Sequence, residues 1–143
     1  MDLKYIWELP ESMPKEKVES HFVNLLDFAE EQVDHLKLDE LKILEILEAL
    51  DQLSERQGYT YELLDDTTMI RVESLIDQLL NFNNENIVEM IASIVLKLGL
   101  KNVFNNMKNA LKDELPQKVK MIIQETIDEA GDHIEDPYHS IKK

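Results

Sequence analysis

The sequence contains no cysteine, and this absence removes several kinds of chemistry at once. Without thiols there are no disulfides, no thiolate metal sites and no cysteine nucleophile, and the chain is compatible with a reducing compartment. The chain is 143 residues long. A domain of about this size buries roughly 70% of its extended-chain surface, so it needs none of these devices for stability. The length predicts one domain, residues 1–143.

Glycine and basic residues are also scarce. The three glycines, Gly58, Gly99 and Gly131, each stand where a helix is expected to end, so neither a phosphate-binding loop nor a dinucleotide fingerprint is present. Lys and Arg number 15 against 30 Asp and Glu, which gives a formal net charge of −15. Binding to a nucleic-acid backbone depends on clustered cations, so we expect no nucleic-acid partner.

Long apolar runs and a targeting leader are missing as well. The chain begins MDLKYIWE, which has neither a basic leader nor an apolar segment of the usual length. The most apolar stretch, residues 87–100, is interrupted by Glu89, Lys97 and Gly99 and falls short of the roughly 20 residues that a membrane-spanning helix needs. We therefore expect no membrane partner and a cytoplasmic location.

What the sequence does have is helical periodicity through most of its length. Apolar residues recur at three- and four-residue steps, and capping residues divide the pattern into segments. We expect six helices, at about residues 14–36, 40–57, 67–81, 85–98, 103–115 and 116–130. The fourth is apolar on nearly every side and is expected at the centre. Residues 1–12 are expected to form a strap across the helices, and residues 132–143 a polar tail.

These segments predict an all-α fold, a single-domain bundle of about six antiparallel helices. The alternative is a short α-solenoid of stacked helix pairs. A solenoid needs a sequence repeat, and no period of 33 to 47 residues recurs here.

The histidines show neither zinc-protease nor di-iron spacing. None of them forms the H-E-x-x-H pattern, and the residues three before His21 and His35 are Val18 and Gln32, where a di-iron bundle requires glutamate. The other two are His133 and His139. We expect no catalytic residues, no metal and no cofactor, and we rank an enzyme with an unrecognised helical site as the third alternative.

The charge is concentrated in the first half of the chain. Residues 1–66 hold 18 acidic and 6 basic residues, whereas residues 67–143 hold 12 and 9. Within the second helix, the spacing of Glu45, Glu48, Asp51 and Glu55 by three and four residues predicts a ridge of carboxylates on one face. One interpretation is a solvated face that keeps the protein soluble. The other is a binding surface for a basic protein.

On the second interpretation, acids from the end of the first helix and from the loop after the second helix join the ridge. Together they are expected to make one extended anionic surface that binds the partner. Its members are Glu30, Glu31, Asp34, Glu45, Glu48, Asp51, Glu55, Glu62, Asp65 and Asp66. Such a surface steers a cationic partner and suppresses wrong ones.

A small, acidic, cysteine-free helical chain with this ridge and no catalytic set resembles the immunity proteins of bacterial contact-dependent growth-inhibition and related polymorphic-toxin systems. The resemblance is one of general character, since members of that class have unrelated folds. It implies a cytoplasmic, non-enzymatic inhibitor that binds and neutralises a cognate toxin, here a basic nuclease domain and in particular a ribonuclease.

The alternative function is a helical adaptor or regulatory subunit that receives a partner helix in an apolar groove. The two differ in salt dependence, because only the anionic surface relies on long-range attraction. Self-repulsion of the acidic half favours a monomer.

Overall fold

The computed structural model describes residues 3–34, 38–131 and 133–134, and these residues contain helices and no strands. The elements are a 3-10 helix and six α-helices. Their bounds are η1 Leu3–Glu8, α1 Lys15–Asp34, α2 Glu40–Gly58, α3 Asp66–Leu79, α4 Glu85–Leu98, α5 Lys101–Ala110 and α6 Gln117–Ala130. The expected all-α, single-domain bundle is confirmed.

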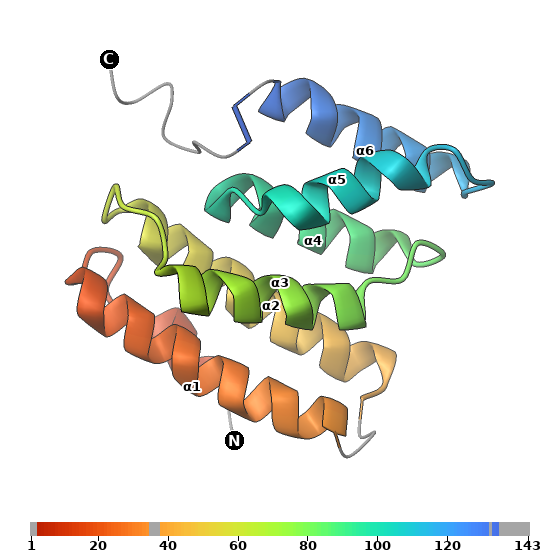
Figure 1. Cartoon of the computed structure of the whole chain (residues 1–143). Helices are drawn as coiled ribbons and strands as arrows, with labels where there is room; N and C mark the ends of the chain where they lie inside the picture. Colours follow the sequence, from red (N-terminus) through yellow and green to blue (C-terminus); the bar gives the residue numbers. More distant parts are fainter. Residues whose placement is uncertain (1–2, 35–37, 132, 135–143) are drawn as a thin grey trace.

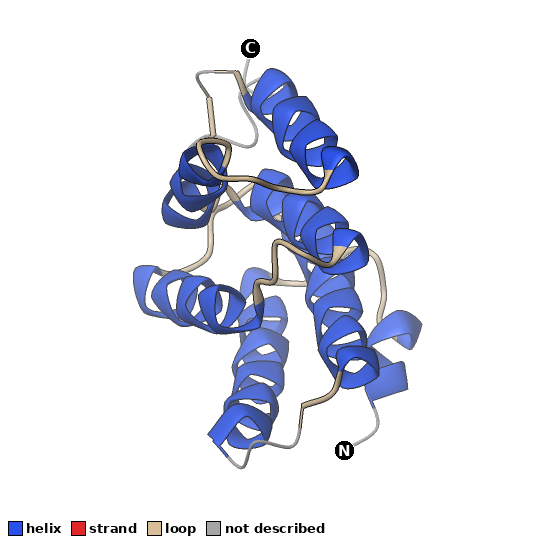
Figure 2. Cartoon of the chain, turned by 90° about the vertical axis from the view of Figure 1, so that its right-hand side faces the viewer, coloured by secondary structure: helices blue, strands red, loops and turns tan. Residues whose placement is uncertain are grey.

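The helices lie in two layers that alternate along the chain. Helices α1, α3 and α5 form the layer nearer the viewer in Figure 1, and α2, α4 and α6 form the layer behind it. Figure 2 shows the same two layers from the side. Consecutive helices run in opposite directions, as expected, so helices that share a layer run in the same direction (Figure 1). The serial contacts are α1 with α3 and α3 with α5 in one layer, and α2 with α4 and α4 with α6 in the other.

Helix α4 lies at the centre of this arrangement and contacts α2, α5 and α6. Seven of its side chains are buried, from Ile87 to Leu98. Its ends are defined by the sequence: the Asn84 side chain accepts from the backbone N–H groups of Asn86 and Ile87, and Gly99 ends the helix in the left-handed conformation at φ 73°. One continuous hydrophobic cluster extends around it, from Leu3 to Ile123.

The N-terminal segment packs against α2. Leu3 and Ile6 of η1 are buried, and the buried Arg56 of α2 donates from Nη2 to the backbone oxygens of Trp7 at 3.3 Å and Leu9 at 3.1 Å. These contacts join segments 47 and 49 residues apart. Of the polar tail expected at residues 132–143, only His133 and Ile134 belong to the described residues.

The fifth helix is shorter than expected. The expected end was Leu115, but α5 ends at Ala110, and residues 111–113 form a turn. A proline disfavours helical geometry in the residue before it, so Pro116 excludes Leu115 from the helix. Leu111 and Leu115 still pack against the core, half-buried, from outside the helix. The apolar spacing therefore correctly indicated that Leu111 and Leu115 are packed against the core, but it did not indicate where the helix ends.

The start of α5 is capped by a distant residue. Leu100 precedes the helix and offers no side-chain acceptor. The buried carboxylate of Glu73 in α3 takes this place: it accepts from the backbone N–H of Asn102 at 2.9 Å, from that of Val103 at 3.4 Å and from the Asn102 side-chain amide at 3.2 Å. An acid at a helix N-terminus also meets the favourable end of the helix dipole. This cap fixes α5 against α3.

Glu73→Ala is expected to lower the free energy of unfolding by about 2 kcal/mol, because it removes a cap and leaves the N–H groups of Asn102 and Val103 without an acceptor. Urea denaturation followed by circular dichroism measures this. Ser74→Ala, at the exposed neighbouring position, is the control and should change stability by less than about 0.5 kcal/mol. Equal stability of the two variants would contradict the cap.

None of the helices in the described residues combines the length and the apolarity that a bilayer crossing requires.

Candidate functional site

The structure divides the predicted anionic surface between the two layers. Glu30, Glu31 and Asp34 lie at the C-terminal end of α1, whereas Asp65 pairs with Lys15 at the N-terminal end of the same helix, at 3.7 Å. A helix of 20 residues is about 30 Å long, so these groups stand at opposite ends of it. These groups therefore extend over the whole length of α1, and their joint binding to one partner stays a prediction.

Glu30 is already held by a cation. The Arg71 guanidinium of α3 donates from Nε and Nη2 to its two oxygens, at 3.1 and 2.6 Å, and from Nη2 to Asp27 at 2.8 Å. Hydrogen bonds to Glu30 and, second, to Asp27 hold the pKa of Arg71 above its usual value. This bidentate pair ties α1 to α3 within the layer of odd-numbered helices. Glu31 and Asp34 are exposed beside it.

The ridge on α2 lies in the layer of even-numbered helices. Glu45, Glu48 and Glu55 are exposed, as the spacing indicated. Asp51 is different, because its side chain is only 19% exposed and accepts from the Ser93 hydroxyl at 2.8 Å and from Lys97 Nζ at 3.0 Å. Asp51 therefore ties α2 to α4. The remaining predicted residues, Glu62, Asp65 and Asp66, lie exposed at the far end of α2, in the loop and at the first residue of α3.

The ridge is joined by carboxylates that the sequence analysis did not select. Two hollows lie side by side on the outside of the even-numbered layer, about 400 Å³ between α2 and α4 and about 390 Å³ between α4 and α6. Glu89 and Ser93 line both hollows, Glu48 and Asp51 line the first, and Glu125 and Glu129 line the second. We call this surface the even-helix acidic face and define it by Glu48, Asp51, Glu55, Glu89, Glu125 and Glu129.

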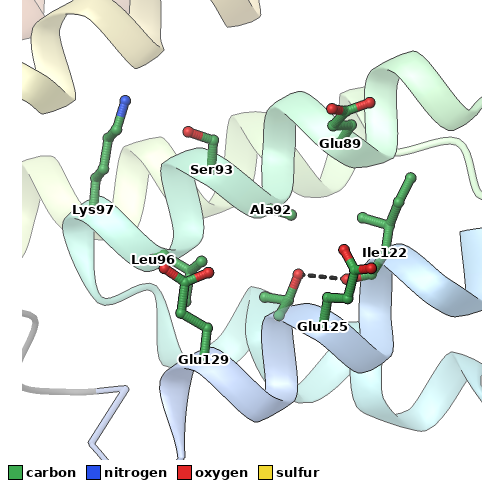
Figure 3. A pocket seen from close by; sticks show the side chains of 9 residues that line it. Glu89, Ala92, Ser93, Leu96, Lys97, Ile122, Glu125 and Glu129 are labelled. Atoms are coloured by element: carbon green, nitrogen blue, oxygen red, sulfur yellow. Dashed lines mark hydrogen bonds between the residues drawn. The ribbon is translucent and has the colours of Figure 1, made fainter.

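Figure 3 shows the second hollow. Glu89, Ser93 and Lys97 project from α4, and the carboxylates of Glu125 and Glu129 reach from α6 toward it. Spacing by four residues places each of these rows along one side of its helix. The Thr126 hydroxyl donates to the backbone oxygen of Ile122 at 2.7 Å, so it is occupied within α6.

Positive charge on this face is nearly absent. Among the described residues, Lys97 is the only basic one that lines the two hollows, and it is held by Asp51 at 3.0 Å and Glu55 at 3.8 Å. No residue of the described part of the chain pairs with Glu48, Glu89, Glu125 or Glu129, so their charges have no internal counterpart. Four of the six carboxylates of the face therefore have no cation partner among the described residues, and the other two share Lys97.

The titratable groups of the remaining surface lie apart from this face. His21 packs against the ring of Tyr5, with centroids 5.9 Å apart, and burial raises the pKa of the Tyr5 phenol. His133 is exposed beyond the end of α6, while His35 and His139 lie outside the described residues. Within the described ranges, no group of three or more acids and histidines has the geometry to hold a metal ion.

Glu30→Gln is expected to lower the free energy of unfolding by about 0.5–1 kcal/mol at low salt, because it weakens a partly exposed bidentate pair with Arg71. Glu31→Gln removes the same charge one residue along and should leave stability nearly unchanged. Thermal or urea unfolding at two salt concentrations measures both. The difference in stability between the two variants should shrink at high salt. Equal stability of the two variants at low salt would show that Glu30 is not paired with Arg71.

No protein-family model, no curated protein and no solved structure matches the chain. Function is therefore inferred from the geometry of its own residues.

Proposed function

We propose that the chain is a non-enzymatic inhibitor that binds a basic protein on the even-helix acidic face. The observation that carries the proposal is the set of carboxylates on α2, α4 and α6 that have no cation partner in the described part of the chain, gathered around two adjoining hollows. Surface carboxylates that repel one another are stabilised when a cationic partner binds, because the opposite charges relieve the repulsion. Their electric field also raises the association rate.

The resemblance to bacterial immunity proteins suggests the partner. A nuclease domain that binds RNA or DNA presents clustered Lys and Arg to phosphates. Carboxylates spaced along three neighbouring helices offer such a surface a substitute for a phosphate backbone. The proposed partner is accordingly a toxin ribonuclease domain, met in the cytoplasm, with the inhibitor as a monomer. The chain supplies charge and shape, and no chemical step is required of it.

A helical adaptor with an apolar groove receives less support. The hollows between α2, α4 and α6 carry Glu48, Glu89 and Glu125 on their linings, and burying these carboxylates under an apolar helix would cost several kcal/mol per unpaired charge. A cationic surface meets the same residues without that cost.

The test is charge reversal with a matched control. Glu48→Lys, Glu89→Lys and Glu125→Lys together change the net charge of the face by six units at exposed positions. The control combines Glu31→Lys, Asp113→Lys and Glu114→Lys, which are also exposed, make the same change of net charge and lie outside the face. Circular dichroism checks that both variants fold.

The partner for this test is identified by cross-linking to the chain in cells of the organism that produces it. The cationic protein found in this way is then purified and assayed for RNA cleavage. The wild-type chain should inhibit cleavage, and its association rate constant should fall as salt is raised. Reversal of the face should lower that constant about tenfold or more, while the control stays close to wild type. Equal loss in both variants, or inhibition that is indifferent to salt and reversal, would contradict the proposal.

A further inference from the structure

The loop between α2 and α3 exposes an unusual amount of aromatic and apolar surface. We call residues 59–65 the tyrosine loop. Tyr59 is 49% exposed, Tyr61 57% and Leu63 43%, while Leu64 is buried and anchors the loop to the core. Among the described residues only seven large apolar side chains are exposed, and three of them fall in this one loop. An exposed apolar cluster of this kind marks an interaction site.

A third exposed aromatic residue lies at the same end of α2. Trp7 is 39% exposed, and its backbone oxygen accepts from Arg56, three residues before Tyr59. In Figure 1 the loop forms the bend between α2 and α3 at the left of the molecule, the end at which α1 begins. The backbone of Trp7 and the tyrosine loop therefore lie at the end of α2 that also carries Glu55.

The loop is held in place by a buried amide. Gln57 has no exposed surface, and its side-chain N–H donates to the backbone oxygen of Glu62 at 2.7 Å. The Thr60 hydroxyl donates to the backbone oxygen of Gln57 at 2.7 Å, and the Tyr61 N–H donates to that of Gly58 at 3.2 Å. A loop ordered before binding loses little conformational entropy when a partner arrives.

Tyr61 itself adopts the left-handed conformation, with φ 54°. This backbone conformation is sterically unfavourable for a residue with a Cβ, whereas a glycine adopts it without strain. Since the side chain is more than half exposed, core packing does not compensate for it. The conformation holds a large aromatic ring outward at a fixed place.

The charge of the loop selects the kind of partner. Glu62 directly follows Tyr61, and Asp65 and Asp66 come at the end of the loop; all three are exposed, and Asp65 remains 65% exposed although Lys15 lies 3.7 Å away. An arginine side chain satisfies both features, because the planar guanidinium stacks on an aromatic face and donates bidentate hydrogen bonds to a carboxylate. Lysine does neither as well. Negative charge opposes an anionic membrane and a second copy of this chain.

We propose that the tyrosine loop, with Asp66, is a docking site for an arginine-bearing segment of a cationic protein. Tyr59 and Tyr61 are the stacking platforms, and Asp65 and Asp66 are the counter-charges. The inference rests on the proposed function only in taking the partner to be cationic. It adds a second contact region, at the end of α2, and a preference for arginine over lysine.

The experiment follows backbone amide shifts of the full-length, isotopically labelled chain during titration with a nine-residue arginine peptide and with a nine-residue lysine peptide. Amides 59–66 should shift, and the arginine peptide should bind about threefold or more tightly than the lysine peptide. Tyr59→Ala with Tyr61→Ala should bring that ratio close to one. The conservative pair Tyr59→Phe with Tyr61→Phe should retain it, because phenylalanine keeps the stacking face.

The matched control is Leu41→Ala with Met121→Ala, which removes exposed apolar surface elsewhere and should leave the ratio unchanged. Shifts confined to α2, α4 and α6 would overturn the loop site while leaving the proposed function standing. Shifts confined to the loop would support the loop site and count against the even-helix acidic face. Loop shifts that depend on protein concentration without peptide, or on neutral lipid vesicles, would assign the loop to self-association or to a membrane and overturn the proposal.

Discussion

The burial of α4 is the constraint on which the rest of the structure depends. This helix is apolar on most of its circumference, so it must be covered from several directions, and α2, α5 and α6 provide the cover. Its remaining polar stripe, Glu89, Ser93 and Lys97, then lies between α2 and α6 on the outer surface. The most hydrophobic helix thereby fixes the centre of the even-helix acidic face. Asp51, which bonds to Ser93 and Lys97, fastens the neighbouring helix beside it.

Much of the fold could be predicted because its signals are local. Asp39 and Asn84 accept from backbone N–H groups two or three residues further on, and Gly99 ends α4 directly after its last residue, so each acts within one turn of helix. The cap of α5 could not be predicted in this way. Glu73 lies 29 residues before Asn102, and nothing near α5 indicates which distant carboxylate reaches its N–H groups. The true end of α5 was hidden because Leu111 and Leu115 continue the apolar period from outside the helix.

The candidate site was predictable only within one helix. Spacing placed Glu45, Glu48 and Glu55 on the exposed side of α2, since helical geometry alone decides this. The neighbours of that ridge depend on layer order, which has no local signal. Glu30 was assigned to the ridge, yet a partner 41 residues away, Arg71, holds it in the other layer.

Counting charge by halves of the chain concealed the second part of the site. Glu89, Glu125 and Glu129 come from the half with the smaller excess of acid, and the alternation of layers brings them to α2. The signal that could have found them is the four-residue spacing of Glu125 and Glu129, together with the rule that next-but-one helices share a layer. A count of charge by layer does not reveal the face either, because α2, α4 and α6 together hold 10 acids and 5 bases, and α1, α3 and α5 hold 9 and 5. The face becomes visible only when the exposed sides of neighbouring helices are compared.

The account stands on the claim that α2, α4 and α6 present their carboxylates on one surface. A cysteine-free chain allows a single nitroxide spin label to be attached through Glu89→Cys, followed by measurement of amide line broadening. The account predicts strong broadening on both sides of the label, at Glu48 and Asp51 of α2 and at Glu125 and Thr126 of α6, with far weaker broadening at Glu30 and Glu31. Sharp amides on α6, or broadening of α1 equal to that of α2, would contradict it.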